Sequence, residues 1–344
     1  MTDVKIKRDF ALDYIRMLAT FMIAFCHFFQ ILDIYGLAFW LNTGVQIFLI
    51  LSVRLLYRKR FESVREVLEF YKSKILRIMI PVWIYTLAIC FVLFIIKYPL
   101  SITTVVIYML GGAAFIDSGI LGLGHFWYIS IILIAYFLVP LLSLFAEKSK
   151  KLSAFALAAI CFGIFAVLTG VFYFIGNAFY GVNLSLFVIA YYIFQRSDSE
   201  EFESRAIKYT LAPALIAIIL RIVLEYMGIS AWSIYGLYDS VFVTVCKSLL
   251  AFVLFFVFYK LFNREYFRRF NKYALAVSTF SFEIYITHQF IELAVYEYVP
   301  YCDSGTFIGA VVMLVASVML IVINTLLLRF AVNVLNKIWA VIKK

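Results

Sequence analysis

The sequence predicts an all-α fold, a polytopic membrane helix bundle of about ten transmembrane helices with both termini in the cytoplasm. Of its 344 residues, 65% are hydrophobic and only 15% are charged, and the mean hydropathy is +1.01. A soluble domain of this length does not need so much apolar surface. The apolar segments are roughly 20 residues long, which suits helices that cross a bilayer and exceeds the length of barrel strands. The basic residues gather in alternate connections.

Each predicted span is an apolar segment bounded by polar or charged residues. Residues 101–115 are also apolar, but Gly111 and Gly112 interrupt them, so we expect a re-entrant or interfacial piece. Residues 61–74 are amphipathic, and we expect them to form a helix on the inner membrane surface. The ten predicted spans cover residues 10–34, 38–57, 77–97, 125–145, 152–175, 178–195, 208–228, 238–261, 273–299 and 306–331.

The placement of the basic residues predicts the orientation. If the N-terminus is cytoplasmic, almost all Lys and Arg residues outside the spans lie on the cytoplasmic side, and the opposite connections carry only Lys97. This is the positive-inside bias of membrane proteins, and with ten spans it places both termini in the cytoplasm. The net charge of +10 therefore indicates membrane topology and not nucleic-acid binding. Because the polar connections are short, residues 1–344 are predicted to form a single transmembrane domain.

The first predicted span carries a polar stripe. Arg16 and His27 are 11 residues apart, so they share one helix face and lie roughly 16 Å apart along the axis. Asp13 falls close to the same line, and the other faces are apolar. Lipid cannot satisfy such side chains, so the stripe must face protein or water. His27 and Arg16 are therefore candidate functional residues, although a lone histidine can also serve only to hold a neighbouring helix.

The chain has three histidines, His27, His125 and His288. The predicted topology places all three in the outer half of the membrane, with His125 at the outer start of the fourth span, so they could meet. A second polar stripe follows the ninth span, and in it Glu292 lies one turn from His288, where it could orient that ring. This stripe consists of Ser278, Ser281, Tyr285, His288 and Glu292.

These residue types limit the chemistry. A neutral imidazole is a good general base, and arginine suits phosphate recognition. The sequence has no Walker loop, dinucleotide fingerprint, zinc-protease motif or nucleophile elbow. The five cysteines show no metal-binding spacing, so no metal is expected. A histidine base within the bundle and a basic inner face suggest transfer of a group from a phosphate-bearing cytoplasmic donor to an acceptor on the far side.

Five motifs follow one another along the chain. The first is LDYIRMLATFMIAFCHF, in which ten residues separate arginine from histidine, and the second is VQIFLILS. The third is FYKSKILRIMIPVW, with Lys74 and Arg77 before a proline. The fourth is HFWYISIILIAYFLVPLL, with His125 and Trp127, and the last is FSFEIYITHQFI. In this order they resemble the motifs of the acyltransferase 3 family of integral membrane acyltransferases, of the polysaccharide O-acetyltransferase type.

The sequence departs from the family pattern at two places. A glycine usually follows the second motif, whereas Val53 and Arg54 follow Ser52 here. The third motif usually has two arginines three residues apart, and Lys74 replaces the first of them.

The resemblance implies an acyl-CoA-dependent O-acyltransferase. Its donor would be cytoplasmic acetyl-CoA or another acyl-CoA, and its acceptor a hydroxyl of a cell-surface polysaccharide, an exopolysaccharide or its lipid-linked precursor. His27 would be the general base and Arg16 would position the donor, whose phosphates Lys74 and Arg77 would attract. The residues expected to line the substrate pocket are Asp13, His125, Trp127, Ser281, Tyr285, His288 and Glu292.

The resemblance also implies a multi-pass protein of the cell membrane, in bacteria the inner or cytoplasmic membrane. The expected partners are membrane lipid, the acyl-CoA and the glycan acceptor, with a homo-oligomer left open and no nucleic acid. Three alternatives stay open: transfer of succinyl or another acyl group, a glycan or lipid transporter or flippase, and a sensor or scaffold. Consumption of a thioester would separate an enzyme from a transporter.

Overall fold

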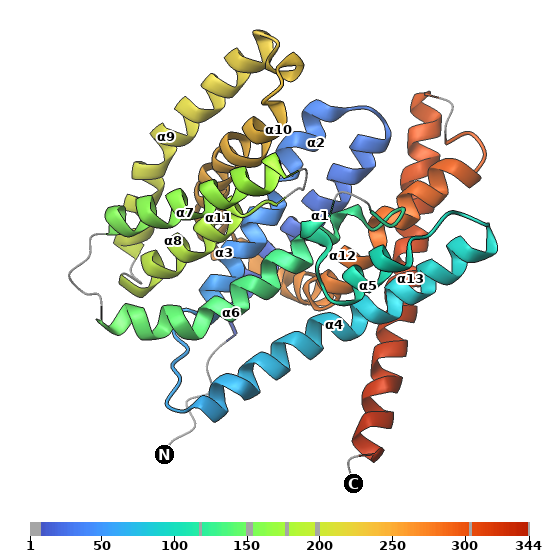
Figure 1. Cartoon of the computed structure of the whole chain (residues 1–344), viewed down its shortest axis with the longest axis horizontal. Helices are drawn as coiled ribbons and strands as arrows, with labels where there is room; N and C mark the ends of the chain where they lie inside the picture. Colours follow the sequence, from blue (N-terminus) through green and yellow to red (C-terminus); the bar gives the residue numbers. More distant parts are fainter. Residues whose placement is uncertain are drawn as a thin grey trace.

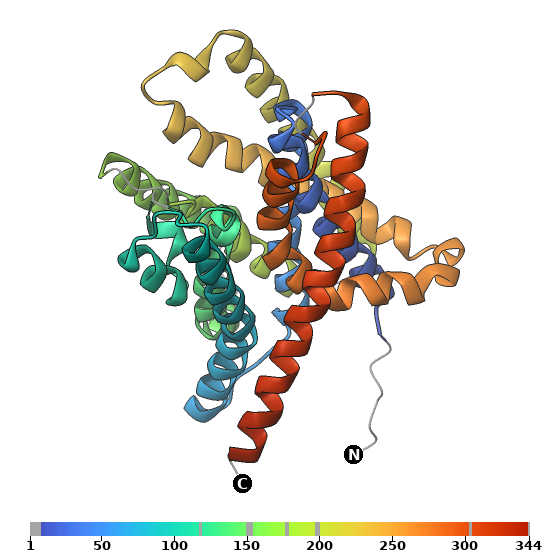
Figure 2. The same ribbon diagram turned by 90° about the vertical axis from the view of Figure 1, so that its right-hand side faces the viewer.

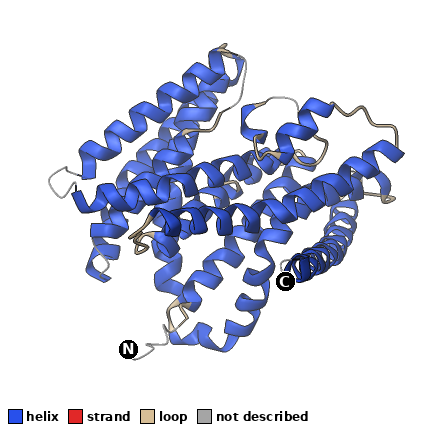
Figure 3. Ribbon diagram, turned by 60° about the horizontal axis from the view of Figure 1, so that its bottom comes forward, coloured by secondary structure: helices blue, strands red, loops and turns tan. Residues whose placement is uncertain are grey.

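The structure is a computed structural model that describes residues 8–116, 119–148, 154–175, 179–196, 200–302 and 305–342. In these ranges the chain forms helices and no strand (Figures 1 and 3), which confirms the predicted all-α fold class. The helices are α1 (Phe10–Ile31), α2 (Tyr35–Leu41), α3 (Gly44–Leu56), α4 (Val64–Ile95), α5 (Ile102–Met109), α6 (Trp127–Lys148), α7 (Ala154–Phe174), α8 (Val182–Arg196), α9 (Glu200–Tyr226), α10 (Tyr235–Tyr238), α11 (Thr244–Phe262), α12 (Asn271–Tyr298) and α13 (Phe307–Ile342). Short helical segments join some of them: η1 (Ala113–Phe115), η2 (Gly124–Phe126), η3 (Ile229–Ala231), η4 (Asp239–Val243) and η5 (Glu265–Phe270).

Seven helical segments among the described residues are long and apolar enough to cross a membrane. They coincide with seven of the predicted spans, so the polytopic membrane architecture is confirmed. The other three predicted spans also contain helices: α7 and α8 include shorter apolar stretches, and α12 carries the second polar stripe. The count of ten spans and the cytoplasmic termini stay predictions. The seven segments are Phe10–Ile31, Tyr35–Leu56, Val64–Ile95, Gly124–Phe145, Ser204–Tyr226, Tyr235–Phe262 and Phe307–Val341.

Helix α4 combines two elements that were predicted from the sequence to be separate. Most of the amphipathic stretch 61–74 and the third predicted span form one continuous helix, which begins at Val64. Ser63 caps its start, where the side-chain oxygen accepts a hydrogen bond of 3.3 Å from the Glu66 backbone N–H. The charges of 61–74 end the apolar pattern, but they do not interrupt backbone hydrogen bonding, so the helix continues through them. The expected separate surface helix is therefore the first part of α4.

The short apolar segment after α4 is interrupted as predicted. Helix α5 ends at Met109, and Gly111 adopts a φ of +75°, which favours glycine. The indole N–H of Trp83 on α4 donates to the Met109 carbonyl at 2.6 Å and fixes this end against α4.

Helix α1 is the central helix of the bundle and packs against α2, α3, α11 and α12. Helix α3 approaches it closely, because a Cβ added at Gly44 would lie only 2.9 Å from the Ala19 carbonyl oxygen. The Asp13 carboxylate links α1 to α12 by accepting a hydrogen bond of 2.8 Å from the Ser278 hydroxyl. Both of its oxygens also accept bonds from the Arg8 guanidinium, at 2.7 and 2.9 Å.

Helix α13 extends beyond the rest of the bundle. Its C-terminal part and the start of α4 lie at the same end of the molecule in both views (Figures 1 and 2), as the predicted orientation requires. Arg329 of α13 forms an ion pair with Glu283 of α12, whose carboxylate is buried. This pair holds α13 against the bundle at the wall of the cavity described below.

Candidate active site

The fold brings the three histidines together. His27 comes from α1, His125 from η2 and His288 from α12. The ring centroids of His125 and His288 are 4.7 Å apart, and those of His27 are 5.1 Å from His288 and 5.8 Å from His125. His125 and His288 are buried, whereas His27 is partly exposed. We call these three side chains the histidine cluster.

The loop before His125 packs directly against α12. Gly122 has a φ of +72°, and a Cβ added there would lie 2.7 Å from the Phe290 Cα atom. The hydroxyl of Tyr285, also on α12, donates to the His125 carbonyl oxygen. The backbone of this loop therefore sets the position of the His125 ring.

The substitution Gly122→Ala is expected to lower both stability and activity. The left-handed φ alone costs on the order of 1 kcal/mol for a residue with a Cβ, and here the methyl group also collides with α12. Gly228→Ala is the matched control, since its φ is +77° and nothing lies within 4 Å of the added Cβ. Thermal unfolding in lipid nanodiscs and the rate of the expected acyl transfer should show both losses for Gly122→Ala and only the stability loss for Gly228→Ala. If the two variants lost stability and activity to the same extent, the result would contradict the contact between Gly122 and α12.

Gln289 joins two members of the histidine cluster. Its Oε1 accepts from the backbone N–H of His125 at 3.1 Å and lies 2.7 Å from the Nδ1 atom of the same residue. Its Nε2 lies 3.2 Å from Nδ1 of His27. Sequence reasoning missed this residue because it lies about 100° around the helix from His288, off the predicted stripe. Its position next to a buried histidine was the only available signal.

The ring of His288 is oriented by backbone groups. Its Nδ1 atom lies 2.8 Å from the Tyr285 carbonyl oxygen and 3.2 Å from that of Ile284. We expected Glu292 to orient this ring, but the two backbone carbonyls contact it instead. The Oε2 atom of Glu292 is buried without a hydrogen-bond partner in the described part of the chain. The Nε2 atoms of His125 and His288 are also buried and lack a partner there.

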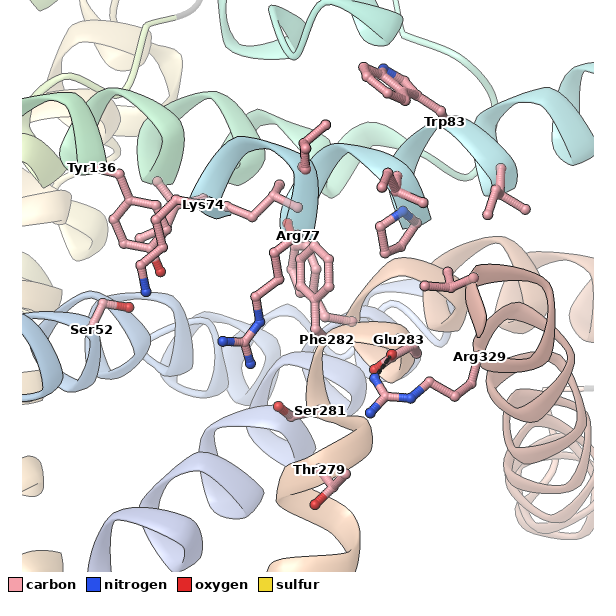
Figure 4. A pocket seen from close by; sticks show the side chains of 18 of the residues that line it. Ser52, Lys74, Arg77, Trp83, Tyr136, Thr279, Ser281, Phe282, Glu283 and Arg329 are labelled. Atoms are coloured by element: carbon pink, nitrogen blue, oxygen red, sulfur yellow. Dashed lines mark hydrogen bonds and ion pairs between the residues drawn. The ribbon is translucent and has the colours of Figure 1, made fainter. Parts of the chain in front are cut away.

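A cavity of about 830 Å³ lies among α3, α4, α6, α12 and α13, with Arg16 of α1 in its wall. Lys74 and Arg77 enter it from α4, one turn apart, and Figure 4 shows Arg77 extending toward α12 and Lys74 beside Tyr136. The wall includes the predicted pocket residues Ser281 and Tyr285 and Ser278 of the same polar stripe. It also includes residues that were not predicted to line the pocket: Ser52, Tyr128, Tyr136, Glu283 and Arg329.

Three cations of this cavity have no carboxylate partner. In the described part of the chain no ion pair involves Arg16, Lys74 or Arg77. The carboxylate of Asp13, one turn from Arg16, is occupied by Arg8. The Lys74 ammonium instead lies 5.3 Å from the ring centroid of Tyr136. Uncompensated positive charge in a cavity favours an anionic ligand.

Tyr285 lies between the cavity and the histidine cluster. It lines the cavity, and its ring centroid is 4.9 Å from that of His125 and 5.9 Å from that of His288. Tyr128 also lines the cavity and packs on Tyr285 at 5.7 Å. Tyr285 and Tyr128 therefore form part of the cavity wall on the side of the histidine cluster.

Five of the seven predicted pocket residues do not line the cavity. His125 and His288 are members of the histidine cluster, whereas Asp13, Trp127 and Glu292 lie outside both the cavity wall and the cluster. Asp13 is used in the bonds to Arg8 and Ser278 described above and is not part of the cavity wall. Trp127 begins α6 and packs on Tyr180, with ring centroids 4.7 Å apart. Among the described residues, no group of three His, Cys, Asp or Glu side chains is arranged to hold a metal ion.

Comparison with known families shows where this fold belongs. The family model described as "Acyltransferase domain", of the acyltransferase 3 family, matches residues 9–327. The matched range contains the histidine cluster, the three unpaired cations and all five motifs. No curated protein and no solved structure matches the chain. The resemblance found in the sequence is thus confirmed, and the chain belongs to the acyltransferase 3 family and is a membrane acyltransferase.

Proposed function

We propose that the protein transfers an acyl group, in the simplest case acetyl, from a cytoplasmic acyl-CoA to a glycan hydroxyl on the far side of the membrane. One observation carries this proposal: a cavity lined by three unpaired cations shares the wall residue Tyr285 with a histidine cluster. An anionic donor and a group that moves protons are what such a transfer requires.

The cavity suits coenzyme A by charge and by size. Coenzyme A carries several phosphates, and Arg16, Lys74 and Arg77 supply positive charge that forms no ion pair with a carboxylate of the described residues. Bonds between such cations and phosphate oxygens are charge-assisted and strong, and arginine can form two at once. The volume of about 830 Å³ lies within the range of roughly 300–1,000 Å³ found for small-molecule sites.

The histidine cluster supplies the general base, and we assign this role to His27. It is the member of the cluster that is partly exposed, and it shares a face of α1 with Arg16 of the cavity wall. The acceptor oxygen attacks the thioester carbonyl carbon, so a C–O bond forms and the C–S bond breaks. His27 takes the hydroxyl proton and then returns it to the departing thiolate. Arg16 holds the donor with its thioester toward the cluster.

The acceptor and the location complete the proposal. Family membership favours a hydroxyl of a cell-surface polysaccharide, an exopolysaccharide or a lipid-linked precursor. The protein would act in the bacterial cytoplasmic membrane, with lipid, acyl-CoA and glycan as its partners and no metal cofactor.

The test is release of free coenzyme A by the purified protein in lipid nanodiscs. Acetyl-CoA and succinyl-CoA are supplied in parallel, each with and without a panel of polysaccharides. We expect release that depends on the acceptor and a labelled acyl group on the glycan. No release with any acyl-CoA, combined with movement of a glycan lipid across the membrane, would contradict the proposal and favour a transporter.

A further inference from the structure

We propose that Gln289 is a positioning residue that determines which ring nitrogen of His27 accepts the proton. The inference rests on the proposed role of His27 as the general base. It is carried by the geometry of one side-chain amide, which contacts two of the three histidines of the chain.

The orientation of the Gln289 amide is fixed by the backbone. A backbone N–H can only donate, so the atom of Gln289 that faces the His125 N–H at 3.1 Å must be the oxygen, Oε1. The amide nitrogen, Nε2, therefore faces His27 Nδ1 at 3.2 Å. An amide nitrogen can only donate. His27 Nδ1 is thus the acceptor of this bond, and the proton of the neutral ring is on Nε2.

The same amide fixes the opposite arrangement in His125. Gln289 Oε1 lies 2.7 Å from His125 Nδ1 and can only accept, so this nitrogen carries the proton. In His288 the two carbonyl oxygens near Nδ1 require a proton there too. In the resting cluster, His27 is then protonated on Nε2, and His125 and His288 are protonated on Nδ1. We take all three rings as neutral at rest, because desolvation disfavours the charged imidazolium and neighbouring positive charges disfavour one another.

This proton distribution makes Nδ1 the basic atom of His27. At rest the Gln289 N–H occupies the position from which an acceptor hydroxyl would donate its proton. This bond, at 3.2 Å, is longer than the two that Gln289 makes to His125, so it is the one that an entering hydroxyl displaces.

Gln289→Glu separates this role from simple attachment of the 119–126 loop to α12. A carboxylate still accepts both bonds from His125, so the attachment is kept. It cannot donate to His27 Nδ1, and it instead favours a proton on that nitrogen. If Gln289 only attached the loop, Gln289→Glu would behave as the wild type.

The experiment is ¹⁵N NMR of histidine-labelled protein in nanodiscs, combined with steady-state kinetics. Three histidines give few signals, and single His→Gln variants assign them. In the wild type we expect His27 protonated on Nε2 and His125 and His288 on Nδ1. In Gln289→Glu, His27 should change to Nδ1–H while His125 keeps its proton on Nδ1. His288, which is held by backbone carbonyls, is the internal reference.

The kinetic expectation follows from the same change. In Gln289→Glu the kcat should fall by on the order of 10–100-fold, as it does when groups that orient a metal-ligating histidine are removed, while KM for the acyl-CoA is unchanged. Wild-type His27 protonated on Nδ1, or an unchanged kcat in a variant whose His27 has changed tautomer, would overturn the proposal. The spectra need no acyl donor, so they test the positioning even if the wild type releases no coenzyme A and the proposed function fails. If Gln289→Glu does not fold, the wild-type spectra alone still show which nitrogen of His27 carries the proton, and so they still test the proposal.

Discussion

His27→Ala is expected to abolish acyl transfer while the protein remains folded. Removing a general base costs on the order of 10²–10⁴ in rate, and the other two rings of the cluster are buried and cannot replace it directly. The donor cavity does not include His27, so binding of the acyl-CoA should persist. The measurement is the initial rate of coenzyme A release, together with donor affinity from isothermal titration calorimetry.

Phe21→Ala is the control for this experiment. Phe21 lies on the same helix and is 41% exposed, so its truncation should leave both rate and donor affinity near the wild-type values. If His27→Ala retained the wild-type rate, the side chain would have only a structural role and the proposed mechanism would be wrong. If the variant lost donor binding instead of rate, His27 would belong to the donor site.

The double substitution Lys74→Gln with Arg77→Gln is expected to raise KM for the acyl-CoA by at least about 100-fold. A hydrogen bond to a charged group contributes roughly 1.5–3 kcal/mol, and each 1.4 kcal/mol corresponds to about tenfold in affinity. The kcat should change only a few-fold, since neither side chain contacts the histidine cluster in the described structure. Steady-state kinetics over a range of donor concentrations gives both parameters.

Arg65→Gln is the matched control on the same helix. Its side chain is 88% exposed and pairs with Glu69 on the surface of α4, so its neutralisation should leave KM unchanged. Added salt should raise KM in the wild type by screening the phosphates, and it should do so less in the double variant. An unchanged KM in the double variant would exclude this cavity as the phosphate site.

The sequence predicted the fold well where hydrophobicity carries the information. All ten predicted spans contain a helix, and the interruption after α5 lies at the predicted glycines. The prediction of two separate elements was wrong at α4, where a charged stretch ends the apolar pattern but the helix continues. Hydropathy reports which residues can face lipid, whereas helix continuity depends on backbone hydrogen bonds that charged side chains do not break.

Helical spacing placed Arg16 with His27 and Tyr285 with His288, and the family resemblance singled out Lys74 and Arg77. The structure places Arg16, Lys74, Arg77 and Tyr285 in the cavity wall and His288 beside His27. The sequence did not predict that Asp13 would be occupied by Arg8, because the partner of a carboxylate depends on which side chains the fold brings near it. Nor did it predict the pairing of Glu283 with Arg329 from the next helix.

The sequence by itself therefore determined the class of protein, its family and the face of each helix that carries polar groups, because these depend on composition, on the order of the motifs and on local helical geometry. Only the tertiary structure decided which polar faces meet. The bond between His27 and Gln289 joins residues 262 positions apart in the chain, and its partners are chosen by the packing of α1, α12 and the 119–126 loop. No local sequence pattern predicts that packing, because the packing depends on the shapes of all the helices together.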